Sequence, residues 1–340
     1  MKLDERKHFV LIKAVDDYIE DASPITSGNI KQKHIQNLST ATLRNELSAL
    51  EAMGFLKQVH VSGGRVPTAL GYRYYVNELL QDVDSDEQAL EEVQELLEGR
   101  TKSLTEIISE LAKLISKKIN YPTVIYTNGY DKLSIENIKI FPLIDKQALA
   151  LIQTLSGYIT MTIQSSADLK SCKDASKFLT AKYSNKTIGE MLQDIEQNSE
   201  NMIIEIQEFR MIVVSFIDGI RKILSQNRLD IHHEGSAELL GKNVETAEQA
   251  KKVLKLLDNE SELEKALELD ENQKDLTVTL VEEDKYSGCA LVKAPLCIDG
   301  KAVASIGVLG PQRMNYASIA SAIKVVMNEL DKKKTKSIER

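Results

Sequence analysis

A run of small polar side chains follows one face of a helix-forming segment near the start of this 340-residue chain. At helical spacing its apolar residues, which predict the buried face, are Leu43, Leu47, Leu50 and Met53. The opposite face and its flanks carry Ala41, Thr42, Arg44, Asn45 and Ser48. Asn pairs with adenine, Arg with guanine, and Ala or Thr methyl groups contact the thymine methyl. Because a merely solvated face more often carries Glu and Lys, this face predicts contact with base edges in the DNA major groove.

A glycine-rich loop, Ser62-Gly63-Gly64-Arg65, follows this helix between two strand-forming runs, residues 55–61 and the residues around Val66. Adjacent glycines supply a hairpin turn and allow close backbone approach, and an Arg at the hairpin tip suits a phosphate or a narrow minor groove. A helix followed by such a hairpin is the layout of a winged helix-turn-helix. The alternative is a plain hairpin turn with a solvated Arg65.

The segment Gly71-Tyr72-Arg73-Tyr74-Tyr75 ends this region with side chains that commonly donate hydrogen bonds to phosphates. It therefore predicts further contacts to the DNA backbone. The tyrosines equally suit packing of the wing onto the first helix, so both interpretations stay open at this point.

Periodicity and capping signals place the elements that must position these residues. Apolar residues recur at helical spacing over residues 4–21. Ser27 is expected to cap a short second helix over residues 28–34. Ser39 is expected to cap the third helix, which Gly54 ends. Three helices and a hairpin therefore form the expected N-terminal domain.

The charge of the chain is unevenly distributed. The net charge is −8, yet residues 23–75 contain six Lys or Arg against two acids, a local excess of four positive charges. Residues 82–98 contain eight acids and no base, which predicts a solvated helix and linker. Any DNA-binding surface is therefore expected to be local and N-terminal, because the acidic remainder disfavours phosphate.

Composition argues against several other classes of protein. Hydrophobic residues make up 42% and charged residues 28%, as in ordinary globular proteins. The N-terminus MKLDERKHF lacks the apolar core of a signal peptide, and no apolar run approaches the ~20 residues that span a bilayer. The three cysteines, Cys172, Cys289 and Cys297, form no CxxC pair. These features predict reduced thiols, no membrane partner and a cytoplasmic location.

No segment presents a convincing catalytic or metal-binding pattern. His232-His233-Glu234 has no further histidine nearby, so a surface loop is expected there. Residues 235–243 superficially resemble a phosphate loop, but five residues separate the glycines and Asn243 takes the place of Ser or Thr. We therefore predict no catalytic residue, no metal, no cofactor and no enzyme activity.

The remainder of the chain indicates an α+β fold. Strand-like alternation over residues 122–165 and again over residues 277–309 flanks a helical middle, residues 173–228. This order predicts one sheet domain that is interrupted by an inserted helical subdomain. A final helix is expected over residues 316–330.

Three separated segments resemble those of the HrcA family of bacterial heat-inducible transcription repressors. They are residues 38–46 (LSTATLRNE), residues 62–75 (SGGRVPTALGYRYY) and residues 306–316 (IGVLGPQRMNY). The third lies far from the first two and in the correct order, so the resemblance covers nearly the whole chain. One departure is Gly28, where the family usually has a basic residue. A phosphate contact of the second helix is therefore expected to be missing.

The resemblance implies a winged helix, a GAF-like domain and a dimerisation domain inserted in the latter. It implies a homodimer on an inverted-repeat operator, the CIRCE element, ahead of chaperone operons. It also implies that GroEL chaperonin keeps the repressor active until heat-damaged protein competes for it. The matching DNA-contact residues are Thr40, Thr42, Arg44, Asn45, Gly64, Arg65 and Arg73. The predicted DNA-binding set is completed by Ser39, Ser48, Ser62, Gly63 and Tyr72.

The expected domain boundaries follow from these patterns. They are a winged-helix domain over 1–80, an acidic linker over 81–102, a GAF-like domain over 103–172 and 229–332, an inserted helical dimerisation domain over 173–228, and a frayed tail over 333–340.

Two rival functions stay open. One is a ligand-sensing winged-helix regulator that binds a small molecule in the GAF-like domain, and the other is a module that uses its winged helix for protein contacts.

Overall fold

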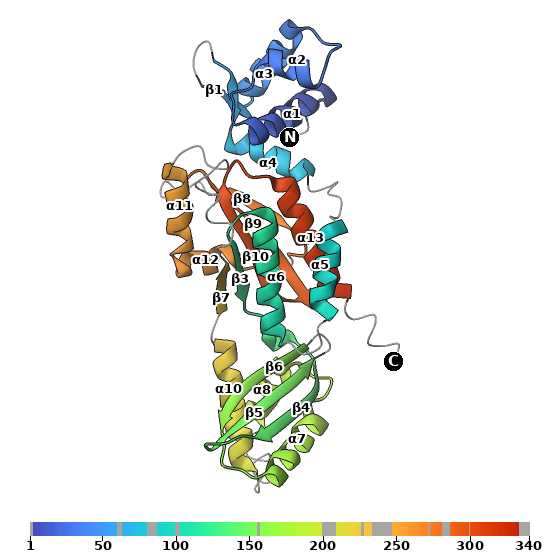
Figure 1. Ribbon diagram of the computed structural model, residues 1–340, viewed down its shortest axis with the longest axis vertical. Helices are drawn as coiled ribbons and strands as arrows, with labels where there is room; N and C mark the ends of the chain where they lie inside the picture. Colours follow the sequence, from blue (N-terminus) through green and yellow to red (C-terminus); the bar gives the residue numbers. More distant parts are fainter. Residues whose placement is uncertain are drawn as a thin grey trace.

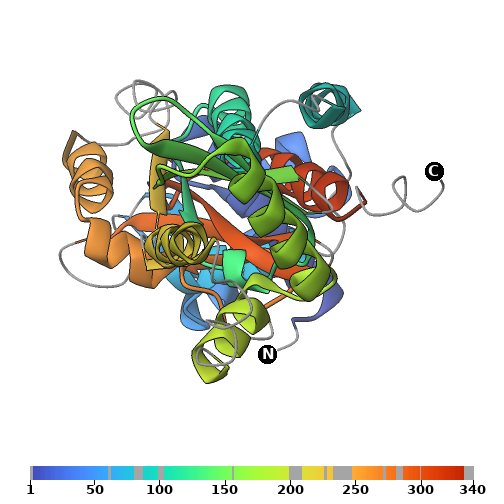
Figure 2. The same ribbon diagram turned by 90° about the horizontal axis from the view of Figure 1, so that it is seen from below.

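The computed structural model of the protein is elongated and consists of three units stacked along its long axis (Figure 1). We call them the head (residues 3–79), the body (residues 87–132 and 228–332) and the insertion (residues 133–225). Figure 2, seen from below, looks onto the insertion with the body behind it. The structure describes residues 3–59, 63–79, 87–98, 103–154, 157–198, 209–225, 228–232, 247–270, 273–280, 286–298 and 300–332.

The head contains the three expected helices, a two-stranded hairpin and a fourth helix. Its elements are α1 (Glu5–Asp21), α2 (Ser27–Lys33), α3 (Thr40–Ala52), β1 (Leu56–Gln58), β2 (Arg65–Pro67) and α4 (Ala69–Leu79). The expected cap of α3 is confirmed, because the Ser39 side chain accepts a hydrogen bond from the backbone N–H of Thr42. The expected cap of α2 was wrong by one residue. Thr26 caps this helix by accepting from the N–H of Asn29, since Ser27 already has helical geometry.

The core of the head forms where the apolar faces of α1, α2 and α3 meet. Leu11, Ile30, Leu43, Leu47 and Leu50 are completely buried there. The helical periodicity therefore predicted the three buried leucines of α3 correctly, whereas Met53 follows the helix as its C-cap and is half-buried. The polar face of α3 lies on the outside of the head.

The body is built on a five-stranded antiparallel sheet in the order β7-β3-β10-β9-β8. Its strands are β3 (Thr123–Thr127), β7 (Arg228–His232), β8 (Thr277–Leu280), β9 (Cys289–Ile298) and β10 (Lys301–Pro311). Its helices are α5 (Glu87–Glu98), α6 (Leu104–Ile119), η1 (Tyr130–Lys132), α11 (Ala247–Leu257), α12 (Glu260–Leu267) and α13 (Tyr316–Lys332). Helix α6 packs against β3, α13 packs against β9, and α5 lies along α13 (Figure 1).

The insertion has a sheet of its own, in the order β4-β5-β6. Its elements are β4 (Ile135–Pro142), β5 (Gln147–Thr154), β6 (Gly157–Gln164), α7 (Leu169–Tyr183), α8 (Ile188–Gln197) and α10 (Arg210–Ser225). Helix α7 packs against β4, and α10 packs against β6. On the buried face lie Ile138, Ile140, Ala148, Ala150, Ile152, Ile159, Met161 and Ile163.

The expectation of one sheet interrupted by a helical subdomain was wrong. Strands β3 and β4 belong to different sheets, so the inserted unit is a mixed α/β unit and not a helical one. The chain leaves the body sheet at Gly129, whose N–H donates to the carbonyl of Val303. Strands β4, β5 and β6 then pair with one another through short turns, because closing a short hairpin costs little chain entropy. Alternation along a strand shows its faces but not its partners.

The described residues lack two features of other classes of protein. Within them, no helix is long and apolar enough to cross a membrane. Across the same ranges, no group of three or more His, Cys, Asp or Glu side chains is gathered as a metal site would need. The segment 235–243, the tail 333–340 and Ser62 lie outside the described residues.

Candidate DNA-binding interface

The outward face of α3 presents polar side chains to solvent. Thr40, Arg44, Asn45 and Ser48 are exposed, and Thr42 is half-buried. Within the described part of the chain, the side chains of Arg44 and Asn45 make no hydrogen bond or ion pair with another residue. Both side chains are therefore available to a partner, as readout of base edges requires.

The first turn of α3 is fixed by its own hydroxyl groups. Ser39 Oγ accepts from the Thr42 N–H at 3.0 Å and lies 2.9 Å from Thr42 Oγ1. Ser39 Oγ therefore caps the helix, and one of the two hydroxyls donates to the other, which fixes the start of α3 at the surface.

The acidic residue on the flank of this face is neutralised by α1. Glu46 Oε2 lies 3.3 Å from Lys7 Nζ, and Glu46 Oε1 lies 3.5 Å from an Arg6 guanidinium nitrogen. The carboxylates of Asp4 and Glu46 raise the pKa of Lys7 above its ordinary value through hydrogen bonds. Glu46 therefore adds little net negative charge beside the face that a DNA phosphate would approach.

The wing arginine lies elsewhere than expected. Arg65 begins β2 opposite Gln58, and its side chain is only 13% exposed. Its Nε donates to Glu51 Oε2 at 2.8 Å and its Nη2 donates to Ser48 Oγ at 2.9 Å. The expectation of a solvent-facing Arg65 at the wing tip was wrong, because Glu51 and Ser48 draw the guanidinium back onto α3.

The wing glycine also serves the fold of the head. A Cβ on Gly64 would lie 2.7 Å from the Pro24 carbonyl carbon and 2.8 Å from the Ile25 oxygen. Ile25 forms an isolated antiparallel β-bridge with Arg65 here, with N–H···O bonds in both directions. The close approach expected for DNA is therefore used by the chain itself. Gly63 beside it is half-buried.

The tyrosines after the wing lie on α4 and pack inside the protein. Tyr72 is only 3% exposed, so the expectation that it contacts DNA was wrong. Tyr74 OH lies 2.9 Å from His8 Nδ1, and Tyr75 OH donates to Asp16 Oδ1 at 2.7 Å. Both contacts reach α1, as the packing interpretation predicts. Arg73 remains exposed on α4.

The departure at Gly28 leaves room at the surface of α2. Gly28 is exposed, and a Cβ there would make only an ordinary contact of 3.7 Å with Thr26 Oγ1. The neighbouring cation Lys33 is bonded to Asp21 at 2.6 Å and to Asp17 at 3.2 Å. Lys33 is therefore committed to the acidic residues of α1.

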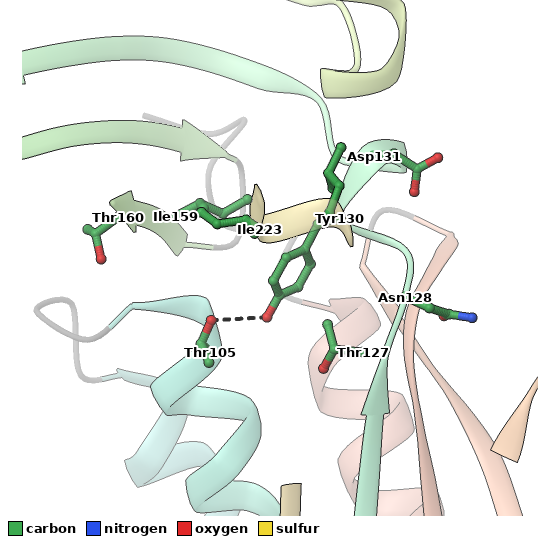
Figure 3. A pocket seen from close by; sticks show the side chains of 9 residues that line it. Thr105, Thr127, Asn128, Tyr130, Asp131, Ile159, Thr160 and Ile223 are labelled. Atoms are coloured by element: carbon green, nitrogen blue, oxygen red, sulfur yellow. Dashed lines mark hydrogen bonds between the residues drawn. The ribbon is translucent and has the colours of Figure 1, made fainter. Parts of the chain in front are cut away.

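A cavity of about 320 Å³ separates the body from the insertion (Figure 3). Its lining residues are Thr105, Thr127, Asn128, Tyr130, Asp131, Ile159, Thr160, Ile223 and Leu224. Tyr130 OH and Thr105 Oγ1 lie 3.1 Å apart across it, while Asn128 and Asp131 point away from that pair. None of the described residues that line it is basic, so these side chains offer no counter-charge to an anion.

Comparisons with known proteins point to one family. The family model described as "HrcA protein C terminal domain" matches residues 105–320. A heat-inducible transcription repressor HrcA from Desulforamulus reducens is 26% identical over 340 residues, covering 98% of this chain and 97% of that protein. The repressor of the same name from Thermoanaerobacter sp. (strain X514) is 29% identical over 338 residues, covering 97% and 96%.

Among solved structures, the crystal structure of a hypothetical protein has the same fold. It covers 99% of this chain and 100% of its own, with a TM-score of 0.63 and 21% sequence identity. The three-unit architecture is therefore found in an experimentally determined structure as well.

Proposed function

Because this chain belongs to the HrcA family of heat-inducible transcription repressors, we propose that it represses chaperone operons from an inverted-repeat operator of the CIRCE type. It is a DNA-binding regulator and not an enzyme. The observation that carries the proposal is the outward face of α3, where Arg44 and Asn45 are exposed and uncommitted. Occupancy of the operator would then exclude transcription sterically.

In this proposal α3 enters the major groove with its exposed face toward the bases. Arg44 and Asn45 read base edges, and Thr40 lies at the end of the helix that approaches the groove floor. Arg73 on α4 and the backbone around Gly63 supply contacts to phosphates. Arg65 takes a supporting role, since its bonds to Glu51 and Ser48 tie the wing to α3.

The operator symmetry calls for a two-fold dimer, and the insertion offers the surface for it. Among the described residues, six of the ten large exposed apolar side chains lie in the insertion: Phe141, Leu143, Ile144, Leu169, Met211 and Val214. The outer face of its sheet also carries Leu149 and Leu151, both half-buried, beside exposed Thr160 and Thr162. We place self-association of two copies here.

Light scattering tests the dimer with two exposed substitutions. Phe141→Asp combined with Ile144→Asp is expected to shift the protein to a monomer, because Ile144 is 86% exposed in the single chain and its substitution spares the core. Leu254→Asp on α11 is the matched control, since it changes an exposed apolar residue of the body. If the double variant remained a dimer, the dimer interface would have to lie on a surface other than that of Phe141 and Ile144.

The heat response is proposed to act through the folded population in the cytoplasm. A chaperonin of the GroEL type would maintain that population, and damaged protein would compete for the chaperonin after heat stress. Operator binding is therefore expected to fall on heating and to return when chaperonin is added.

A gel shift on the chain's own chaperone promoters tests the central proposal. The protein is expected to bind an inverted repeat in preference to a scrambled duplex of equal length, at matched salt and at several temperatures. Equal affinity for both duplexes would sink the proposal and favour a module that uses its winged helix for protein contacts.

A second candidate function rests on the cavity between body and insertion. Its volume of about 320 Å³ suits a small molecule without negative charge. A ligand-sensing regulator would show a metabolite-dependent rise in melting temperature and a ligand-dependent change in operator affinity.

A further inference from the structure

The third motif segment, residues 306–316, lies in the body and is largely buried. It forms the end of β10 and the turn into α13. A Cβ on Gly307 would lie 2.4 Å from a methyl group of Leu267 on α12, and one on Gly310 would lie 2.4 Å from Met314 Sδ. Both glycines therefore serve packing within the body. In the turn that follows them, Arg313 and Tyr316 contact the head.

Arg313 links this turn to the first helix of the head. Its Nη1 donates to the carbonyl oxygen of Ile19 at 2.8 Å, across 294 residues of sequence. The residue is only 8% exposed. Ile19 lies in the last turn of α1, where free carbonyls and the helix dipole favour a positive charge. A largely buried cation is thus held against one end of the head.

An aromatic contact accompanies this bond. The rings of Tyr316 and Tyr72 lie 6.3 Å apart at 54°, and both residues are buried. Tyr316 OH donates to the Gln312 carbonyl at 2.6 Å. Burial raises the pKa of Tyr316, reinforced by neighbouring Tyr121 and Tyr75, so its hydroxyl stays neutral. The turn therefore contacts α1 through a cation and α4 through a ring.

The space beside these contacts is hollow. A cleft of about 590 Å³ lies between head and body. Head residues that line it include Lys57, Pro67 and Ala69, and body residues include Gln249, Ser287 and Gln312. The cleft leaves part of the boundary unpacked, so the angle between the two units rests on the contacts beside it, which include those of α4 with β8 and α13.

We propose that Arg313 is a positioning residue for operator binding: with the Tyr72–Tyr316 contact it fixes the angle of the head on the body. In a dimer that angle sets the distance and direction between the two α3 helices. Half-sites on one face of DNA are separated by whole helical turns, so a fixed angle selects one spacing. The inference rests on the proposed dimeric operator binding.

Effective concentration explains the expected size of the effect. When both heads are held at the right spacing, the second head binds as an intramolecular event. Loss of the Arg313 bond lets the head adopt many angles, which lowers the effective concentration of the second head at its half-site. The contacts of each α3 with its own half-site do not change.

The test compares full-length protein and Arg313→Ala on three duplexes at matched salt: the natural inverted repeat, the same repeat with five extra base pairs in the spacer, and a single half-site. The wild type is expected to prefer the natural spacing. The variant is expected to lose about tenfold or more on the natural repeat, to keep its half-site affinity, and to bind both spacings nearly equally. Lys255→Ala, which removes an exposed cation on α11 of the body, is the matched control and should match the wild type on all three duplexes.

Arg313→Lys keeps the charge and one donor toward Ile19, so it should fall between wild type and Arg313→Ala. An unchanged spacing preference in Arg313→Ala would overturn the inference. Loss of half-site binding in both variants would overturn it too, because Arg313 would then serve folding of the head. Failure of the wild type to prefer any inverted repeat would instead overturn the proposed function.

Discussion

The outward face of α3 and the wing beside it contain equally polar residues, yet they differ in what those residues contact. On α3, Arg44 and Asn45 are exposed and uncommitted within the described chain. In the wing, Arg65 is bonded to Glu51 and Ser48, and Gly64 lies against the backbone of residues 24–25. A residue type that can bind DNA can equally bind the protein's own polar groups. What distinguishes the Arg44 and Asn45 side chains from Arg65 is that they have no partner among the described residues.

The largest expected effect tests the α3 side of this comparison. Arg44→Ala should weaken operator binding by about 2–6 kcal/mol per dimer, because each half-site loses one contact worth about 1–3 kcal/mol. The free energy of unfolding should change by less than about 0.5 kcal/mol, since Arg44 is exposed. A salt-matched titration and a urea titration measure the two quantities. If Arg44→Ala bound the operator as tightly as the wild type, Arg44 would not contact DNA.

Gly64→Ala tests whether the wing serves the fold. Its Cβ would meet backbone atoms at 2.7–2.8 Å, so we expect a loss of about 2–3 kcal/mol in the stability of the head. Gly28→Ala is the matched control. Its Cβ has room, and the helix should gain about 0.5–1 kcal/mol. Equal stability of the two variants in denaturant titrations would contradict the close approach at Gly64.

Arg65→Ala separates the two possible roles of the wing arginine. It should lower the stability of the head by about 1 kcal/mol, through the lost bonds to Glu51 and Ser48. The dependence of operator affinity on salt should stay unchanged, because the guanidinium is already paired. A slope reduced by about one phosphate contact per half-site would show that Arg65 exchanges Glu51 for DNA.

The smallest effect is expected at the surface of α2. Gly28→Lys should add about one phosphate contact per half-site and steepen the salt dependence accordingly, with little change in stability. The exposed position and the 3.7 Å contact allow the longer side chain. Gly28→Ala is again the control, because it adds a side chain without charge. A salt dependence equal to that of the control would place this end of α2 away from DNA.

Much of the head could be predicted from the sequence because its signals are local. The bounds of α1 and α3, the Ser39 cap and the buried leucines agree with the structure, since capping and helical periodicity depend on residues a few positions apart. The remaining DNA-contact residues, Thr40, Thr42, Arg44, Asn45, Gly63 and Arg73 among them, stay predictions. Helix α4 shows what a local signal could have added: the buried residues Gly71, Tyr72, Tyr75 and Val76 follow a helical repeat.

Local patterns in the sequence were enough to predict the winged head, the polar face of α3 and the three motif segments that mark the family. The pairing of β3 with β10 and not β4, the contact of Tyr72 with Tyr316 and the bond of Arg65 to Glu51 are visible only in the folded chain. These contacts join residues of separate elements. Caps and periodic faces are determined by neighbouring residues, whereas a strand, a buried ring or a long cation finds its partner among all the segments that folding brings near. Arg313 reaching Ile19 across 294 residues is the clearest case.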